Sequence, residues 1–386
     1  MAASRKGQRP HGRRIRCPGG YFAFVPAPLP PSIEWDDALT AALSRADLAI
    51  GRLGGEGRRF PKPHFFIRSF VRREAVLSSR IEGTRTTLAE LLAAEAGRSG
   101  KADTADLREV GNYVAALEYG LERLDSLPLS LRLIRELHER LMRNVRGDAA
   151  TPGEFRLSQN WIGPPGCGLQ DAAYVPPPVE EMAECLYALE QFLHDRNLPP
   201  LVHTALAHAQ FEAIHPFIDG NGRVGRLLIT LLLVERGLLP SPLLYLSAYF
   251  EATRETYYAQ LLAVTEDGAW EDWLIYFLDG VRSQAEDALV RIGRIDALLA
   301  GWLDEFAGAS SRRVEEVLGL FVETPFWTVR EIARRLGVAY TTARRAVDRL
   351  EDAEIVALIG ERKRNRVYCA RAVLEALEAP VERGDG

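Results

Sequence analysis

Apolar side chains recur at helical spacing along most of the chain. From Ala38 to Leu53 they repeat every three to four residues, as in a helix with one buried face. The adjacent glycines Gly54 and Gly55 predict that this helix ends there. The same spacing predicts further helices over residues 67–79, 104–124, 129–144, 179–195, 200–213, 221–236, 253–265 and 270–300. The body of the protein is therefore expected to be mainly α-helical.

Two segments interrupt this pattern. Residues 21–32 contain four prolines and should be extended, because proline restricts the backbone and disfavours helix in the residue before it. Residues 147–178 hold the run Pro176–Pro178 and two short β-prone pieces. A connection this long in a compact domain is usually functional or disordered, and we interpret it as a β-hairpin flap.

The densest group of candidate functional side chains in the chain lies around the start of the predicted helix 221–236. This stretch runs from His215, in the loop before the helix, to Arg226 in its first turns, and reads HPFIDGNGRVGR. Gly220 and Gly222 allow positive φ angles and close approach of the backbone to a ligand. They stand where an almost wholly apolar, buried helix begins, so its free N–H groups form an anion site.

Charged side chains surround this predicted anion site. Arg223 and Arg226 are three residues apart on the first helical turn, where a bound anion would relieve their conflict with the helix dipole. Asp219 is an oxygen ligand suited to Mg²⁺ bound together with phosphate. His215 is the side chain best placed to accept a proton near neutral pH.

Three other interpretations of this region are disfavoured. Gly220, Gly222 and Gly225 satisfy GxGxxG, but a helical pattern rather than a strand precedes them, so a dinucleotide-binding βαβ unit is excluded. No GxxxxGK(S/T) phosphate loop is present. The spacing of His203, His208 and His215 does not fit HExxH, and we expect the first two to be core or surface histidines.

Composition narrows the class of protein. The chain has 386 residues, of which 47% are apolar and 26% charged, with a formal net charge of −5. This balance is typical of a soluble protein of two or three domains. No apolar stretch approaches the length of a membrane helix, so we expect no membrane partner. The four cysteines form no CxxC pair, which favours the cytoplasm.

The stretch His215–Arg226 resembles the signature of the Fic family, HxFx(D/E)GNGRxxR, at every fixed position. The resemblance extends over roughly residues 21–300, including Gly153–Arg156, Gln159–Gly163 and Tyr174–Pro178 in the expected flap. It implies an all-α domain that transfers AMP from ATP to a Ser, Thr or Tyr hydroxyl of a protein, including itself.

The resemblance also implies individual roles. His215 would be the general base, Asp219 would hold Mg²⁺, and Arg223 and Arg226 would bind the β- and γ-phosphates. The remaining nucleotide-binding positions would be Gly220, Asn221, Gly222, Gly225, Tyr257 and Tyr258. The two tyrosines would lie beside adenine, with ordinary core tyrosines as the alternative. In the flap, a target segment would pair by strand addition at Asn160, Trp161, Ile162 and Gly163.

A second family motif lies earlier in the chain. Residues Ser78–Gly83 fit (S/T)xxxE(G/N), the inhibitory-helix motif, at the end of a predicted helix. The resemblance implies that Glu82 pairs with Arg226 and withholds it from the γ-phosphate. The alternative is a plain helix end with Gly83 as its cap.

The chain changes character after about residue 308. Residues 310–371 contain 13 Lys and Arg against 9 Asp and Glu, a net charge of +4. Thr328–Gly337 and Tyr340–Ala353 are predicted helices, with Thr328 and Glu331 as a capping box, and Ile355–Ala370 is a predicted hairpin. This order resembles a winged helix-turn-helix domain. The residues expected to touch DNA are Arg344, Arg345, Arg349, Lys363 and Arg364, with protein contacts as the alternative use.

The expected fold is thus a Fic-type helical bundle with a β-hairpin flap and a C-terminal winged helix. The expected parts are a disordered basic tail (1–20), an N-terminal helical region (21–110), a catalytic core (111–300) and a winged-helix domain (308–375). Three alternatives stay open: a DNA-binding regulator with a silent core, an enzyme that mainly removes AMP, and a donor other than ATP. A homodimer is also left open.

Overall fold

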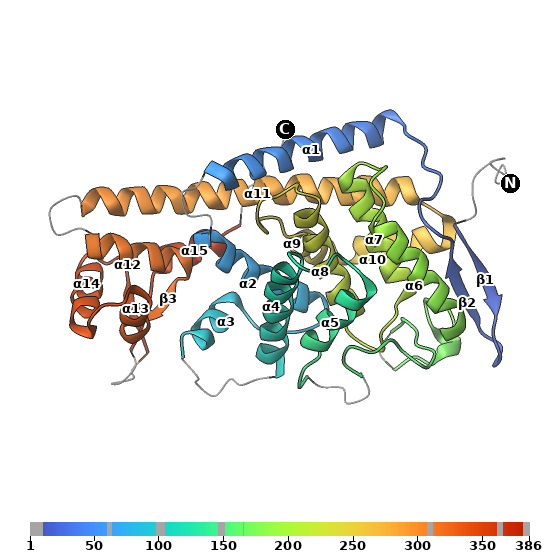
Figure 1. The fold of residues 1–386 in the computed structure, drawn as a ribbon, viewed down its shortest axis with the longest axis horizontal. Coiled ribbons are helices and arrows are strands. Elements are labelled where there is room, and N and C mark those ends of the chain that lie inside the picture. Colours follow the sequence, from blue (N-terminus) through green and yellow to red (C-terminus); the bar gives the residue numbers. More distant parts are fainter. Residues whose placement is uncertain are drawn as a thin grey trace.

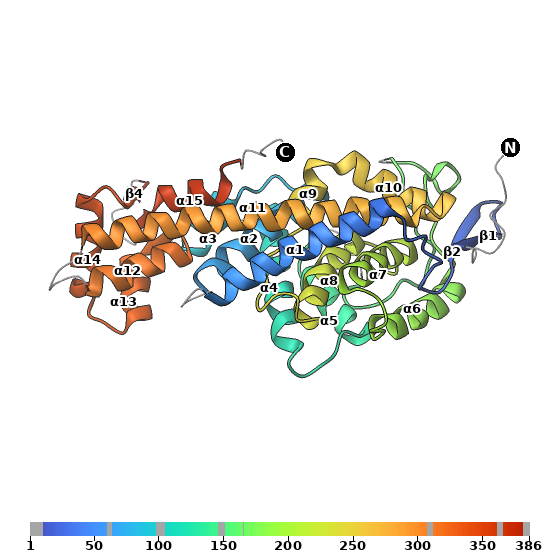
Figure 2. The ribbon, with the colours of Figure 1, turned by 90° about the horizontal axis from the view of Figure 1, so that it is seen from above.

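The computed structural model describes residues 11–59, 64–97, 105–145, 151–164, 166–306, 312–360 and 366–380. In these residues the protein is mainly helical, with two small antiparallel sheets. The molecule is elongated, with a helical body between a short N-terminal hairpin and a C-terminal group of helices and strands (Figures 1 and 2). No helix among the described residues has the length and apolar composition needed to cross a membrane.

Two long helices lie side by side along the molecule. They are α1 (Asp37–Arg59) and α11 (Trp270–Glu305), seen along the top of Figure 1. The prediction that the first helix ends at Gly54–Gly55 is wrong. Close packing explains the continuation: a Cβ at Gly54 would lie 3.1 Å from the Leu238 carbonyl oxygen. Packing of this kind outweighs the roughly 1 kcal/mol that each glycine costs a helix.

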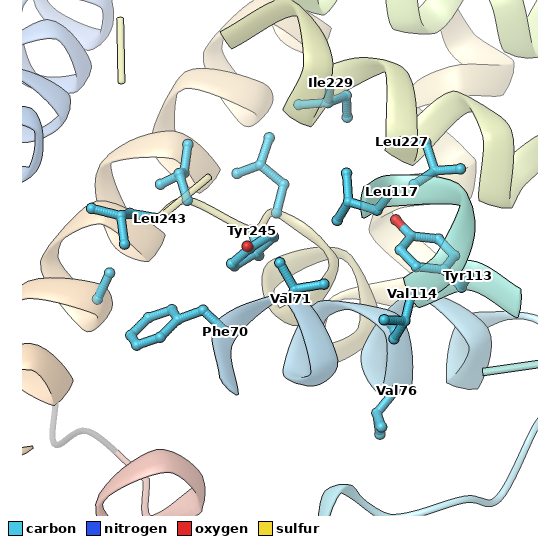
Figure 3. Close-up of a cluster of buried hydrophobic side chains, with 14 of the residues drawn as sticks. Phe70, Val71, Val76, Tyr113, Val114, Leu117, Leu227, Ile229, Leu243 and Tyr245 are labelled. Carbon is cyan, nitrogen blue, oxygen red and sulfur yellow. The ribbon is translucent and has the colours of Figure 1, made fainter. Parts of the chain in front are cut away.

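The other helices of the body lie below this pair in Figure 1. They are α2 (His64–Ile81), α3 (Leu88–Glu95), α4 (Ala105–Arg123), α5 (Leu131–Leu141), α6 (Val179–Leu193), α7 (Pro200–Ile214), α8 (Asn221–Glu235), α9 (Ser247–Ala252) and α10 (Arg254–Asp267). As predicted, α8 is buried almost all round. Figure 3 shows Phe70 and Val71 of α2 near Tyr245, and Tyr113 and Leu117 of α4 near Leu227 of α8. This shared core packs α2 and α8 against α4. The sequence pattern missed α3 and α9, which are short.

The N-terminal segment pairs into a hairpin. Strand β1 (Gly12–Arg16) runs antiparallel to β2 (Phe22–Pro26). The expectation of a disordered tail is therefore wrong for residues 12–16, while residues 1–10 lie outside the described residues. Backbone pairing and an ion pair fix the strand, since Arg13 Nη2 lies 2.7 Å from Glu181 Oε2 of α6. The extended backbone expected for residues 21–32 includes β2.

The C-terminal elements form a compact group. They are α12 (Arg312–Glu323), β3 (Phe326–Thr328), α13 (Val329–Leu336), α14 (Tyr340–Asp352), β4 (Ala357–Ile359), β5 (Val367–Cys369) and α15 (Arg371–Glu378). The capping box is present, because Thr328 Oγ1 accepts from the Glu331 N–H and the Glu331 carboxylate accepts from the Thr328 N–H. The predicted hairpin is also present. It gains β3 as a third strand, in the order β3–β5–β4.

This group docks on the helical body at two places. The Ser69 hydroxyl of α2 donates to the Glu323 carbonyl oxygen at the end of α12, at 3.0 Å. On α11, Arg291 Nη1 donates to the Leu377 carbonyl oxygen at the end of α15, at 2.6 Å. Helix α2 thus contacts the C-terminal group directly.

The basic side chains of α14 are only partly available to a ligand. Arg344 pairs with Asp348 at 2.5 Å and donates to the Tyr368 hydroxyl of β5, and its side chain is 29% exposed. Its expected contact with DNA stays a prediction. The guanidinium of Arg349 lies 5.3 Å from the Phe306 ring centre, and Arg345 is exposed. Lys363 and Arg364 lie outside the described residues.

Candidate active site

His215 ends α7 in an unusual backbone conformation. Its φ is 48° and its ψ 61°, the left-handed region, which non-glycine residues rarely adopt. Its N–H donates to the Phe211 carbonyl oxygen at 3.0 Å, and this bond closes the last turn. Such a conformation costs about 1–3 kcal/mol and persists only where the surroundings enforce it. The chain then turns through the motif loop, residues 215–220, into α8.

Asn221 holds the motif loop in shape. Its Oδ1 accepts from the Phe217 N–H and its Nδ2 donates to the Phe217 carbonyl oxygen, both at 2.8 Å. The side chain is buried. Both ends of the Asn221 amide are bonded to the loop, and its expected contact with phosphate stays a prediction.

Two different constraints favour glycine at the three glycine positions of the motif. Gly220 has the predicted positive φ, 83°, and begins α8. Gly222 does not adopt a positive φ, because it belongs to α8, within the predicted helix 221–236. A Cβ at Gly222 would lie 2.5 Å from Glu82 Oε1 and one at Gly225 would lie 2.2 Å from Glu212 Oε1. Close approach of carboxylates, rather than backbone conformation, requires glycine at both positions.

Arg223 and Asp219 lie at one edge of the α8 N-terminus. Arg223 is buried and pairs with Glu109 at 3.3 Å and with Asp219 Oδ1 at 3.4 Å. The same Asp219 oxygen accepts from the Gly220 N–H at 2.6 Å. The Asp219 side chain is 54% exposed. It is thus available to a ligand.

Arg226 is bound by the end of α2. Its Nη2 donates to Glu82 Oε1 at 2.6 Å and to the Ser78 carbonyl oxygen at 3.0 Å, and its Nε donates to Ser78 Oγ at 2.8 Å. Burial alone would raise the pKa of Glu82, but the neighbouring Arg226 charge outweighs it and lowers that pKa. Gly83 follows with φ 103°, so the motif is both a capped helix end and the partner of Arg226.

His215 presents one ring nitrogen as a base. Its Nδ1 lies 3.3 Å from the Glu212 carbonyl oxygen. A carbonyl only accepts, so Nδ1 carries the hydrogen and Nε2 is left as a proton acceptor. Burial, together with the nearby charge of Arg156, lowers the pKa of His215 to about 4. The imidazole is therefore neutral at physiological pH.

His138 of α5 supports the loop and was missed by the sequence pattern. Its ring stacks on Phe217 with 3.7 Å between ring centres. Nδ1 accepts from the Gly153 N–H at 2.9 Å, and Nε2 lies 3.0 Å from the Asp219 carbonyl oxygen. Burial lowers the pKa of His138 to about 4. A histidine on the apolar face of the predicted helix 129–144 was the available signal.

The flap, residues 151–178, crosses the motif loop without forming a full hairpin. Ile162 and Tyr174 form an isolated antiparallel bridge with bonds of 2.8 and 3.0 Å. The Asn160 amide is buried and donates to the His215 and Phe217 carbonyl oxygens, so its side chain supports the motif loop; its expected backbone pairing with a target stays a prediction. Trp161 and Ile162 are about two-fifths exposed, at 42% and 40%.

A pocket of about 650 Å³ joins these groups. Its charged wall contains Glu82, His215 and Arg226, and its apolar wall contains Tyr258 and Leu261. Flap residues Trp161–Pro164 form one rim. One wall carries the anion site and the other is apolar, which suits a nucleotide.

The two tyrosines expected near adenine differ. Tyr257 touches the pocket but is otherwise a core residue, since its hydroxyl lies 2.8 Å from His208 Nε2 and its ring stacks on Phe250. Tyr258 is exposed toward the pocket and lies 5.8 Å from the Arg254 guanidinium. His203 and His208 are buried, as expected for core histidines, and the described residues contain no metal-type cluster of His, Cys, Asp and Glu.

Comparisons with known proteins agree on one family. The model of the Fic/DOC family N-terminal region matches residues 40–122, and the model of the Fic/DOC family matches residues 128–233. The protein adenylyltransferase Fic of Drosophila yakuba is 31% identical over 198 residues, or 50% of this chain and 37% of that protein. The Drosophila willistoni protein of the same name is 32% identical over 210 residues, covering 53% and 38%. The chain spans little more than a third of these curated relatives.

Solved structures agree on the fold. A Fic family protein from Desulfovibrio desulfuricans superposes with a TM-score of 0.59 at 21% identity, covering 92% of this chain and all of that one. A Fic domain containing signaling protein from Bacteroides thetaiotaomicron gives 0.50 at 20% identity, covering 66% and 95%. At these identities the match concerns the fold alone.

Proposed function

The chain belongs to the Fic/DOC family over residues 40–233, and on that premise we propose that it is a nucleotidyltransferase that moves AMP from ATP onto a protein hydroxyl. One observation carries the proposal: the same pocket contains His215, with Nε2 left as a proton acceptor, the N-terminus of α8, and Arg226. The names of the Drosophila relatives support the same reaction.

In this mechanism His215 acts on the incoming hydroxyl of a Ser, Thr or Tyr residue. Nε2 takes the hydroxyl proton while the oxygen forms a bond to the α-phosphorus. The bond between that phosphorus and the bridging oxygen breaks, and diphosphate leaves with its electron pair. Positioning and charge neutralisation supply most of the acceleration in such transfers.

The phosphates would be held at the start of α8. The N–H groups at Gly222 and Arg223 lie at the positive end of the helix. Arg223 would meet the β-phosphate and leaving group, and Arg226 the γ-phosphate. Adenine would occupy the apolar wall at Tyr258 and Leu261.

Mg²⁺ is proposed as the metal that accompanies ATP. Asp219 is the candidate ligand, and the half-exposed carboxylate fits an ion that takes one or two carboxylates plus substrate phosphates. When bound, the ion would neutralise phosphate charge. The chain's own part is to hold that carboxylate at the loop through the Gly220 N–H.

Glu82 is proposed as an inhibitor of this transfer. Its carboxylate occupies the Arg226 guanidinium, so a γ-phosphate must compete with a buried, charge-assisted bond. Removal of AMP from a modified protein is the alternative use of the same carboxylate.

The flap is proposed to receive the target. Trp161 to Gly163 edge the pocket beside His215, and a single bridge leaves much of this backbone unpaired for an extended protein segment. The enzyme's own chain is included among its targets.

The C-terminal group is proposed to be a winged helix. Helices α13 and α14 with the β3–β5–β4 sheet support this. DNA binding is the corresponding alternative function, supported by exposed Arg345 and weakened by the internal bonds of Arg344. A mobility shift that weakens with salt tests it.

Mass spectrometry of the Glu82→Gly protein tests the main proposal. The protein is incubated with Mg²⁺ and with ATP, GTP, UTP or CTP separately. The added mass identifies the donor, and fragmentation identifies the modified residue. We expect AMP on a hydroxyl. No added mass with any donor, or equal modification of a His215→Ala variant, would refute the proposal.

A further inference from the structure

Arg156 is a buried cation in the flap. Its side chain is 1% exposed. No carboxylate within the described part of the chain lies within salt-bridge distance of it. Its guanidinium instead donates to three backbone carbonyls: His215 at 3.0 Å, Ser158 at 3.3 Å, and Pro177. A cation buried without a counter-ion is costly, so its location calls for a reason.

The contacts of Arg156 converge on the motif loop. Its backbone N–H donates to the Pro216 carbonyl oxygen at 2.9 Å. Asn160, four residues further along the flap, donates from Nδ2 to the His215 carbonyl oxygen at 3.2 Å and to the Phe217 carbonyl oxygen at 2.8 Å. The three consecutive carbonyls that follow α7 are therefore all bound by these two flap residues.

The first of these carbonyls belongs to His215, the residue with the left-handed φ of 48°. His215 is the C-cap of α7, so its carbonyl has no intrahelical partner. Arg156 and Asn160 bind it from the flap, whereas the Phe217 carbonyl is also bound by Asn221 within the loop. The orientation of the His215 ring therefore depends on the flap.

We propose that Arg156 is a positioning residue for His215, which locks the left-handed backbone of the base and joins the flap to the motif loop as one rigid unit. The proposal rests on the proposed transfer reaction for its kinetic consequences, but its structural content does not. Its charge has a second effect, since a cation beside the imidazole disfavours the imidazolium form.

Other charged groups also face His215 and set the background for this effect. They are Glu82 from the end of α2, Asp219 in the motif loop, and Arg226 across the pocket. The first two favour the imidazolium and are outweighed by burial. Arg156 is the cation that touches the His215 backbone.

The test compares variants in the full chain carrying Glu82→Gly. Arg156→Met should lower kcat by about 100-fold with KM for ATP changed less than about threefold, because misplacement of a reacting group affects the chemical step. The acidic limb of its pH profile should move up, toward the ordinary histidine pKa of about 6.5. A residue that only maintained the fold would lower the amount of active protein without moving that limb.

Two further variants separate position from charge. Arg156→Lys keeps the charge but lacks the planar fork, and Asn160→Ala removes loop bonds without altering charge. Both should lower kcat and leave the acidic limb near that of the parent. The matched control is Arg135→Met, because Arg135 also bonds flap backbone, at the Gly153 carbonyl oxygen, but not the motif loop. It should retain parental kcat.

An NMR titration of the His215 ring makes the test independent of turnover. In the wild-type chain, Arg156→Met should raise the His215 pKa, and the change is readable even if no nucleotide is transferred. An unchanged His215 pKa and a kcat within about twofold of the parent would overturn the proposal. An equal loss in Arg135→Met would overturn it too. If Arg156→Met does not fold, Arg156→Lys and Asn160→Ala decide, and parental kcat in both would overturn it.

Discussion

Glu82 and Arg226 are 144 residues apart in the chain, yet Glu82 Oε1 and Arg226 Nη2 lie 2.6 Å apart. The pair connects the end of α2 to the first turn of α8. Arg226 has a second partner on α2, because Ser78 binds it through both its hydroxyl and its carbonyl oxygen. Removal of Glu82 therefore frees one N–H of Nη2, while Ser78 continues to hold the side chain through Nε and Nη2.

Glu82→Gly should raise self-modification by about 10- to 100-fold, because a hydrogen bond to a charged group is worth roughly 1.5–3 kcal/mol. Incorporation of label from α-labelled ATP measures it. Glu251→Gly is the matched control. Glu251 of α9 pairs with Arg80 near the end of α2, at 3.7 Å, and neither residue lines the pocket. Equal labelling of wild type and Glu82→Gly would contradict the inhibitory role. Loss of AMP removal instead would assign Glu82 to the reverse task.

His215→Ala should abolish transfer, with a loss of about 10²–10⁴-fold, the usual contribution of a general base. Nucleotide binding should persist, since the proposed phosphate contacts are with α8 and not with His215. Labelling in the Glu82→Gly background, with equilibrium dialysis of ATP, separates the two effects. His194→Ala, at an exposed histidine after α6, should behave as the parent does. Parental labelling of the His215 variant would exclude this residue as the base.

Gly222→Ala should destabilise the wild-type protein by about 1–2 kcal/mol, since the new Cβ would lie 2.5 Å from Glu82 Oε1. In a Glu82→Gly background most of that cost should vanish, because the atom that is struck has gone. Urea unfolding of the two single variants and the double variant measures the coupling. Additive effects would show that Glu82 is not the group that limits space at Gly222.

Acid should destabilise the fold between about pH 6.5 and pH 4. Burial lowers the pKa of His138, His203 and His215 to about 4 and that of His208 to about 3. The unfolded chain, with ordinary histidines near 6.5, takes up protons first, so stability is lost as pH falls through this window. Glu212 has the opposite effect, because burial raises its pKa to about 8, and Asp47, Glu74 and Glu378, whose pKa burial also raises, act in the same direction. The lowered pKa values of Glu82, Glu136 and Glu316 add to the loss of stability in acid.

Urea midpoints measured from pH 4.5 to 8 check this expectation. The midpoint should fall below pH 6.5. Glu212 predicts that the urea midpoint also falls, with a smaller slope, as the pH rises from 6.5 to 8. In this range the unfolded chain has lost the Glu212 proton and the native protein still holds it. A midpoint that stays level or rises between pH 6.5 and 4.5 would contradict the assignment of buried neutral histidines.

The sequence pattern located the helices and the motif loop well, because periodicity and glycine position are local signals. Most predicted helices match α2 to α11 within a few residues. The roles near Arg226 came from family resemblance rather than from periodicity. Long-range contacts account for the rest: α1 continues past Gly54 because α11 and Leu238 accommodate it, and β3 pairs with a strand about forty residues later.

The candidate site shows the same limit. Nothing local in the sequence marks Arg156 of the flap as a partner of the His215 carbonyl oxygen. The apolar helix face that carries His138 indicates a buried histidine, but not its contact with Asp219 of the motif loop. At Gly222 the pattern correctly predicted the start of a helix, but not the Glu82 carboxylate that crowds this position.

Helix α2 meets the C-terminal group at Ser69 and is followed by Glu82 at the pocket. Those residues are 13 positions apart, or about 20 Å of rigid helix. The chain therefore does not divide cleanly where its charge changes. Separate expression of the catalytic part should retain α12, because a fragment ending at Phe306 would leave the start of α2 without the cover that α12 provides. Studies of isolated fragments should accordingly measure a differently supported inhibitory helix from the one in the intact protein.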